Sequence, residues 1–125
     1  MAFKVLVIED DQDILDILIY VLKEDGYEVI SSVNADILKD IEQLQPDIIL
    51  LDEWLCAEEK GSDYCRKLKA CAATAHIPVL MLSDYTPIEH VVTEAGADGY
   101  IKKPFEIDDL SKSILSHLTK GKAIS

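Results

Sequence analysis

The chain has 125 residues, the size of one domain with a core large enough to need no disulfide or structural metal. Its 24 acidic and 12 basic residues give a net charge of −12, which disfavours direct binding to nucleic acid and favours cations or basic partner surfaces. The sequence has no run of about 18 apolar residues, so we expect a cytoplasmic protein without a membrane span or signal peptide. Its three cysteines lack the paired CxxC spacing of a metal site, so we expect them to be reduced.

Strand-like and helix-like segments alternate along the chain. In chain order, we predict a strand at residues 3–8, a helix at 12–24, a strand at 28–33, a helix at 35–44, a strand at 47–52, a helix at 62–72, a strand at 77–83, a helix from 86, a strand at 99–102 and a helix at 106–118. The polar residues between 52 and 61 are expected to form an irregular connection. Residues from about 119 to 125 are expected to form a frayed tail.

Three local signals support these boundaries. Gly26 follows the first helix, where a left-handed helix end favours glycine. Four consecutive apolar residues at 48–51 suit a central parallel strand that is covered on both faces. Thr86 and Glu89 have the spacing of a capping box at the start of the fourth helix. Strands and helices that alternate with short connections predict a single domain over residues 1–125, with a parallel sheet and helices on both faces.

Chemically reactive side chains gather where the predicted strands end. Glu9 and Asp10 follow the first strand, Asp52 ends the third, Ser83 ends the fourth and Lys103 follows the fifth. Because ligands of open α/β sheets bind beyond the carboxyl ends of the strands, we expect these side chains to converge. Clustered carboxylates repel each other unless a cation joins them, and oxygen ligands without His or Cys favour Mg²⁺. The alternative is that each acid only caps a helix or solvates a turn.

Four segments of the chain resemble bacterial response-regulator receiver domains of the CheY type: residues 5–11, 46–52, 78–83 and 96–105. The resemblance extends over about residues 3–118. It implies a flavodoxin-like, doubly wound (βα)₅ fold with five parallel strands in the order 2-1-3-4-5. It also implies a role in a two-component phosphorelay, with a sensor histidine kinase or a histidine phosphotransfer protein as the phosphoryl donor.

The resemblance assigns a role to each residue of the set at the strand ends, called the acidic constellation below: Glu9, Asp10, Asp52, Ser83 and Lys103. Asp52 is implied as the phosphoacceptor, and Ser83 and Lys103 are expected to contact the phosphoryl oxygens. The implied Mg²⁺ ligands are Glu9, Asp10, Asp52 and the backbone carbonyl of Trp54. A carboxylate that is already ionised needs no general base, so catalysis reduces to placement and neutralisation of charge. The bond between Lys103 and Pro104 is expected to be cis.

The same resemblance implies a conformational switch. Ser83 would move towards the bound phosphate, and Tyr100 would turn inward to fill the space that it leaves. The face formed by the fourth helix, the fifth strand and the fifth helix would change shape as a result. The alternative for Tyr100 is an ordinary aromatic side chain packed on a strand.

Several positions depart from the usual pattern of the family. Cys56 stands where proline is usual, and Gly61 comes one residue late, which implies an insertion in the loop. Asp84 replaces a small residue after the switch hydroxyl and either repels the phosphate or points outward. Trp54 and Tyr85 are bulky and flank the expected route of the hydrolytic water, so we predict that they lengthen the lifetime of the aspartyl phosphate.

The sequence also suggests two alternative functions. A degenerate receiver would act only as a docking module that does not depend on phosphorylation. A flavodoxin-like redox protein is disfavoured because acidic residues at 9–11 stand where a flavin phosphate would bind.

We expect no enzyme activity beyond the chain's own phosphorylation and dephosphorylation. No output domain follows the last predicted helix, so we expect an unidentified target protein or a longer parent protein, and a monomer or a phosphorylation-dependent dimer.

Overall fold

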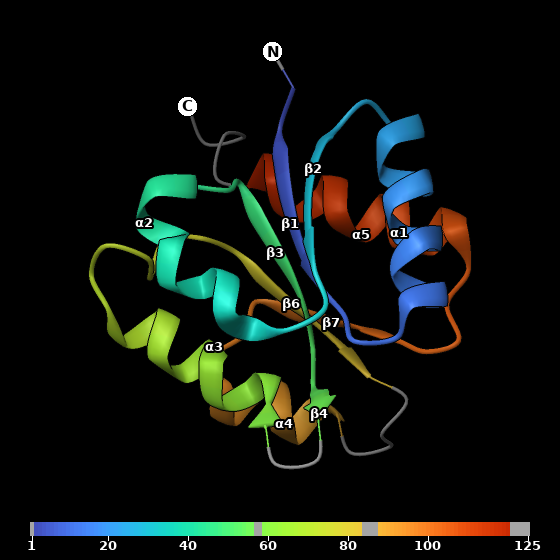
Figure 1. Cartoon of the computed structure of the whole chain (residues 1–125). Helices are drawn as coiled ribbons and strands as arrows, with labels where there is room; N and C mark the ends of the chain where they lie inside the picture. The colour runs from blue at the N-terminus through green and yellow to red at the C-terminus, as the bar shows by residue number, and fades with distance from the viewer. Residues whose placement is uncertain (1, 57–58, 84–87, 121–125) are drawn as a thin grey trace.

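The computed structural model describes residues 2–56, 59–83 and 88–120. Five parallel strands form one sheet in the order β2-β1-β3-β6-β7 (Figure 1). The strands are β1 (Lys4–Ile8), β2 (Glu28–Ser32), β3 (Ile48–Asp52), β6 (Val79–Ser83) and β7 (Gly99–Lys102). Counted along the chain, the strands of this sheet have the predicted order 2-1-3-4-5, which confirms the predicted fold.

Helices cover both faces of the sheet. They are α1 (Gln12–Glu24), the 3₁₀ helix η1 (Ala35–Asp40), α2 (Ile41–Leu44), α3 (Gly61–Ala70), α4 (Ile88–Ala95) and α5 (Ile107–Lys120). α1 and α5 lie on one face, whereas α2, α3 and α4 lie on the other (Figure 1). Neighbouring residues of one strand point to opposite faces. In β1, Val7 therefore belongs to the core under α1 and α5, and Ile8 belongs to the core under α2, α3 and α4.

Helix α1 begins and ends at the predicted residues. Asp11 Oδ1 accepts hydrogen bonds from the backbone N–H groups of Asp13 at 3.0 Å and Ile14 at 3.3 Å. A carboxylate in this position satisfies free N–H groups and interacts favourably with the positive end of the helix. Gly26 has a φ of 91°, the left-handed conformation that was expected after the helix.

The predicted second helix has two parts. Residues Ala35–Asp40 form a 3₁₀ helix, and only Ile41–Leu44 form an α-helical turn. Asn34 caps the 3₁₀ part, because its side chain accepts a hydrogen bond from Asp36 N at 3.0 Å. Gln45 ends the α-helical turn in a left-handed conformation, with a φ of 44°.

The prediction of an irregular connection after Asp52 is wrong. Trp54–Cys56 (β4) and Glu59–Lys60 (β5) form an antiparallel hairpin at the edge of the sheet where β3 ends. Strands of three and two residues are too short for the alternation of apolar and polar residues that identifies a strand in a sequence. The strand register shifts between Trp54 and Cys56, within the segment where the sequence implied an inserted residue.

Helices α4 and α5 correspond to the last two predicted helices. The predicted start of the fourth helix at Thr86 lies outside the described residues. Helix α5 continues to Lys120, two residues beyond its predicted end at 118, so the prediction of a tail is wrong for residues 119 and 120, and the rest of the predicted tail lies outside the described residues. Among the described residues, no helix combines the length and the apolar character needed to cross a membrane.

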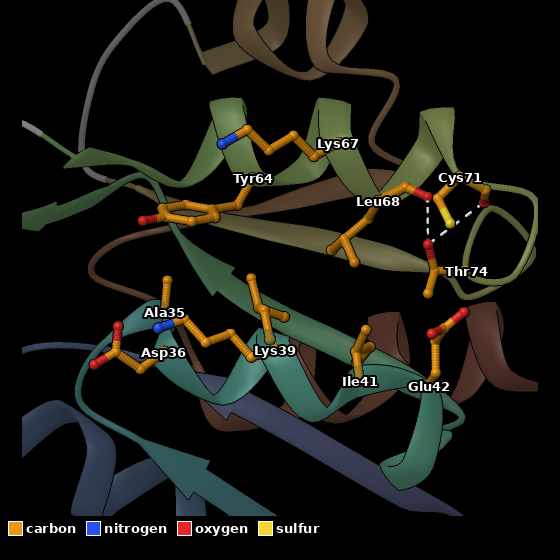
Figure 2. Close-up of a pocket in the computed structure, with 11 residues that line it drawn as sticks. Ala35, Asp36, Lys39, Ile41, Glu42, Tyr64, Lys67, Leu68, Cys71 and Thr74 are labelled. Atoms are coloured by element: carbon orange, nitrogen blue, oxygen red, sulfur yellow. Dashed lines mark hydrogen bonds between the residues drawn. The ribbon is translucent and has the colours of Figure 1, made fainter.

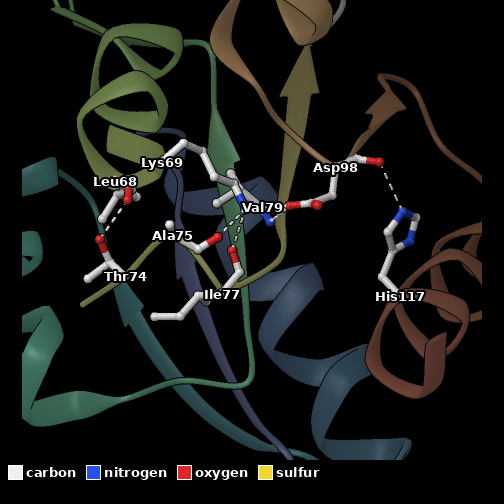
Figure 3. Close-up of polar contacts among 8 residues, drawn as sticks. All are labelled: Leu68, Lys69, Thr74, Ala75, Ile77, Val79, Asp98 and His117. Atoms are coloured by element: carbon white, nitrogen blue, oxygen red, sulfur yellow. Dashed lines mark hydrogen bonds and ion pairs between the residues drawn. The ribbon is translucent and has the colours of Figure 1, made fainter. Parts of the chain in front are cut away.

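A polar network joins three segments at the edge where β6 and β7 begin (Figure 3). Lys69 Nζ donates hydrogen bonds to Ile77 O at 2.8 Å, Ala75 O at 3.2 Å and Asp98 Oδ2 at 2.7 Å. The same Asp98 oxygen accepts a hydrogen bond from Val79 N at 2.8 Å. The network therefore anchors α3 and the loops that lead into β6 and β7, at the edge opposite the acidic constellation.

Candidate functional site

The parallel register brings the predicted site residues to the carboxyl edge of the sheet. Asp52 and Ser83 are the last residues of β3 and β6, and both are buried. Glu9 and Lys103 directly follow β1 and β7. Lys103 N donates a hydrogen bond to Ser83 O at 2.9 Å, so the end of β7 is attached to the end of β6. The bond between Lys103 and Pro104 is cis, as the resemblance implied.

The Lys103 ammonium contacts two buried carboxylates. Lys103 Nζ donates a hydrogen bond to Asp52 Oδ1 at 3.2 Å and forms an ion pair with Glu9 Oε1. The Glu9 side chain is fully buried, whereas the Lys103 side chain is 15% exposed. Among the described residues, Glu9 Oε1 accepts no hydrogen bond of good geometry and depends on this ion pair. The buried part of the site therefore contains two acids and one cation.

This imbalance changes the acidity of the site. Burial, followed by the hydrogen bond and negative charge of Glu9, raises the pKa of Asp52 to about 8, although Lys103 acts in the opposite direction. For Lys103, burial lowers the pKa, but the Glu9 and Asp52 carboxylates outweigh it, so the pKa of Lys103 is raised. The raised pKa favours the protonated form of Asp52 at neutral pH, contrary to the expectation of an already ionised carboxylate, and a further cation would favour the ionised form.

The acidic residues fit a divalent metal ion. One carboxylate oxygen from each of Glu9, Asp10 and Asp52 lies within 4.8 Å of the others. Asp10 is exposed, so an ion at this position would keep access to water. Mg²⁺ binds oxygen ligands, uses few carboxylates and retains several waters. The three carboxylates thus form an acidic pocket that could bind this type of metal.

The structure describes two of the remaining predicted residues, Trp54 and Tyr100. Trp54 is on β4, 41% exposed, with the Lys60 ammonium 5.3 Å from the centre of its ring. Tyr100 is half-buried on β7 and packs against the core under α2, α3 and α4. Asp84 and Tyr85 lie outside the described residues. The metal-binding role of the Trp54 carbonyl and the switch role of Tyr100 stay predictions.

One residue of this region was not predicted. Glu53 directly follows Asp52 and is 2% exposed. Its carboxylate accepts hydrogen bonds from Ser62 N at 2.7 Å and from the Ser62 hydroxyl at 3.1 Å. The only signal in the sequence is a second acid after the apolar run at residues 48–51, and two acids in a row are also typical of a solvated turn.

A groove between α2 and α3 is separate from the acidic pocket (Figure 2). Its volume is about 360 Å³, and its lining residues are Ala35, Asp36, Leu38, Lys39, Ile41, Glu42, Tyr64, Lys67, Leu68, Cys71 and Thr74. None of the acidic site's residues is among them. The groove therefore takes no part in the chemistry of the carboxyl edge.

The sequence of the chain matches a known family over most of its length. Residues 5–115 match the family model of the response regulator receiver domain. The phosphate regulon transcriptional regulatory protein PhoB of Klebsiella pneumoniae is 35% identical over 113 residues, which are 88% of this chain and 49% of PhoB. The DNA-binding dual master transcriptional regulator RpaA of Synechocystis is 36% identical over 110 residues, 86% of this chain and 45% of RpaA. The chain thus spans about half the length of these curated relatives.

Solved structures agree with this match. The crystal structure of a CheY-like response regulator receiver domain protein from Methanospirillum hungatei aligns over 100% of both chains, with a TM-score of 0.88 and 26% identity. The family match, the sheet order and the acidic pocket at the carboxyl edge lead to the same conclusion. The chain belongs to the response regulator receiver domains of two-component systems.

Proposed function

We propose that Asp52 accepts a phosphoryl group from the phosphohistidine of a histidine kinase or a histidine phosphotransfer protein. The observation that carries this proposal is the Lys103 ammonium in contact with the buried carboxylates of Glu9 and Asp52. In the transfer, one Asp52 oxygen forms the new P–O bond while the P–N bond of the phosphohistidine breaks, and the electron pair of that bond stays on the imidazole nitrogen. Lys103 balances the charge of the phosphoryl oxygens.

A metal ion completes the proposed site. Glu9, Asp10 and Asp52 would hold Mg²⁺, together with the backbone carbonyl of Trp54. Once bound, the ion supplies positive charge that favours the ionised form of Asp52 and neutralises phosphoryl oxygens. Lys103 remains the protein's own cation at the site, and its raised pKa keeps it protonated at neutral pH.

The signal would pass from β6 to β7. Ser83 pairs with Lys102, and Met81 pairs with Tyr100, so a movement at the end of β6 has a direct neighbour on β7. A phosphoryl group on Asp52 adds charge and acceptor oxygens, which favour the arrangement with Ser83 turned towards it. Tyr100 would follow, and the face formed by α4, β7 and α5 would present the result to a target protein.

The partners follow from the family and the charge. Receiver domains of response regulators act with histidine kinases. The net charge of −12 argues against nucleic-acid binding by this domain, and DNA binding is stated for RpaA, which extends well beyond the matched segment. We propose that the chain is a monomer or a phosphorylation-dependent dimer. Its only catalytic activity would be its own phosphorylation and dephosphorylation, and Trp54, Asp84 and Tyr85 would modulate the lifetime of the aspartyl phosphate.

Phosphorylation by a small donor tests the proposal. The chain is incubated with acetyl phosphate and Mg²⁺, and intact-mass spectrometry measures the gain of one phosphoryl group. We expect the wild type to gain it, and Asp52→Asn and EDTA-treated samples not to. Trp54 is the only tryptophan, so its fluorescence reports binding of beryllofluoride with Mg²⁺. A wild type that stays unmodified and unchanged in fluorescence would instead favour the docking module that does not depend on phosphorylation.

A further inference from the structure

The Glu53 carboxylate is buried at the first turn of α3. Glu53 is 2% exposed, and its partner Ser62 is 3% exposed. One carboxylate oxygen accepts from Ser62 N at 2.7 Å, and the other accepts from the Ser62 hydroxyl at 3.1 Å. A buried carboxylate is costly unless it is hydrogen-bonded, so these two bonds account for its presence there. Glu53 is therefore not a solvated turn residue.

Glu53 takes the place of a local helix cap. Lys60, the residue before α3, makes no side-chain hydrogen bond to the first turn of the helix. Glu53 supplies the missing acceptor from a position nine residues earlier than Ser62. Its negative charge is favourable at this end of the helix, where backbone N–H groups are free. The first turn of α3 is thus attached to the residue that follows the phosphoacceptor.

The backbone next to Asp52 is held on two sides. Glu53 N donates a hydrogen bond to Leu82 O at 3.0 Å, and Glu53 O accepts one from Gly61 N at 2.8 Å. A Cβ atom on Gly61 would lie 2.1 Å from Asp52 O, so the start of α3 packs directly against the Asp52 peptide. Because this contact leaves no space, a displacement of the first turn of α3 would also change the position of the Asp52 backbone.

We infer that Glu53 is a positioning residue for phosphorylation: it anchors the first turn of α3 to the end of β3 and thereby holds Asp52 and the following backbone in place. This role rests on the proposed phosphorylation of Asp52. The Glu53 side chain bonds to Ser62, whereas the Asp52 side chain bonds to Lys103. Glu53 therefore acts through the backbone and through α3, without touching the phosphoryl group.

Four variants separate positioning from general stability. Glu53→Ala removes both hydrogen bonds, and Ser62→Ala removes only the hydroxyl. Glu53→Gln keeps an acceptor for Ser62 N and an amide that can donate to the Ser62 hydroxyl. Thr74→Val is the matched control at the other end of α3, because it removes the buried hydrogen bond of Thr74 Oγ1 to Leu68 O at 2.7 Å (Figure 3).

Two quantities are measured for each variant and the wild type. One is the rate of phosphorylation by acetyl phosphate at saturating Mg²⁺, and the other is the Mg²⁺ affinity from Trp54 fluorescence. We expect Glu53→Ala to lower both by about tenfold or more, as loss of supporting residues around metal ligands does. Ser62→Ala is expected to show a smaller loss, Glu53→Gln to keep most of both, and Thr74→Val to match the wild type.

Two results overturn the inference alone. One is that the wild type gains the phosphoryl group and Glu53→Ala has the same phosphorylation rate and the same Mg²⁺ affinity. The other is a Thr74→Val variant that loses as much as Glu53→Ala, because general loosening of α3 would then explain both. A wild type that gains no phosphoryl group refutes the proposed function itself, and the positioning role with it.

Discussion

Lys103 Nζ lies 3.2 Å from Asp52 Oδ1, although 51 residues separate the two in sequence. The same ammonium pairs with Glu9, so one cation serves two buried carboxylates. Burial of a charge is costly unless it is paired, and here the acids outnumber the cation. A divalent ion would correct this excess of negative charge.

Replacing Lys103 by methionine is expected to destabilise the fold in a pH-dependent way. The variant leaves Glu9 and Asp52 buried without a cation, which we expect to cost about 2–3 kcal/mol of unfolding free energy at pH 8. The loss should be smaller at pH 5.5, because a protonated Asp52 no longer needs the cation. Urea denaturation at the two pH values measures this difference. An equal loss at both pH values would contradict the prediction, and Lys102→Met, an exposed neighbour, is the control.

The metal-free protein is expected to lose stability as the pH rises. Burial and then Glu9 raise the pKa of Asp52 from 3.8 to about 8. Between these values the folded state holds a proton that the unfolded state has released, so each rise in pH favours unfolding. The decrease in unfolding free energy from pH 5 to pH 8 should be on the order of a few kcal/mol.

Denaturation in EDTA and in Mg²⁺ tests this sign. We expect the decrease in EDTA and a much flatter profile in Mg²⁺, because the ion stabilises the ionised carboxylates. Asp52→Asn serves as the control, since an amide does not titrate and the decrease should largely disappear. A metal-free wild type whose stability increases over the same pH range would show that Asp52 is ionised in the folded state.

The location of the site could be predicted from the sequence, but its contacts could not. Apolar runs identify the strands, and in a parallel sheet the strand ends share one edge, so residues such as Asp52 and Ser83 were expected to meet. Whether each side chain is buried or exposed depends on tertiary packing. Sequence position did not predict that Glu9 is buried and Asp10 exposed, or that Lys103 bonds to both buried acids.

Glu53 illustrates why the rest could not be predicted. Its partner Ser62 lies nine residues away, on the other side of the β4–β5 hairpin. The hairpin itself was not predicted, because strands of three and two residues are too short to give a periodic signal. The same limit applies to η1, where intrinsic preferences do not distinguish a 3₁₀ helix from an α-helix.

Gly61→Ala is expected to disturb the phosphorylation site through simple crowding. The new Cβ atom would lie 2.1 Å from Asp52 O, a backbone atom that cannot rotate away. Overpacking of this kind costs about 1–3 kcal/mol, and we expect phosphorylation by acetyl phosphate to slow as the Asp52 backbone shifts. Gly26→Ala is the matched control: its φ of 91° makes alanine unfavourable, but no atom lies within 4 Å of the new Cβ. It should lower stability without slowing phosphorylation.

Lys69→Met is expected to lower stability and leave phosphorylation unchanged. Three acceptors at the opposite edge of the sheet would lose their ammonium donor (Figure 3). The expected cost is about 1–2 kcal/mol in urea denaturation. Lys67→Met, on the same helix but exposed and stacked on Tyr64, should cost less. A slower phosphorylation of Lys69→Met under conditions where it is fully folded would contradict the separation of the two edges.

Trp54→Ala is expected to shorten the lifetime of the phosphorylated protein. Trp54 lies on β4, two residues beyond Asp52, and the Lys60 ammonium 5.3 Å from its ring helps to keep the indole in place. A bulky ring here would limit the access of water to the aspartyl phosphate, so its removal should raise the dephosphorylation rate severalfold. The rate is followed by intact-mass spectrometry after removal of acetyl phosphate. Tyr20→Ala removes an aromatic ring that is 67% exposed on α1 and should leave the rate unchanged. If both variants decay at the wild-type rate, Trp54 does not shield the phosphate.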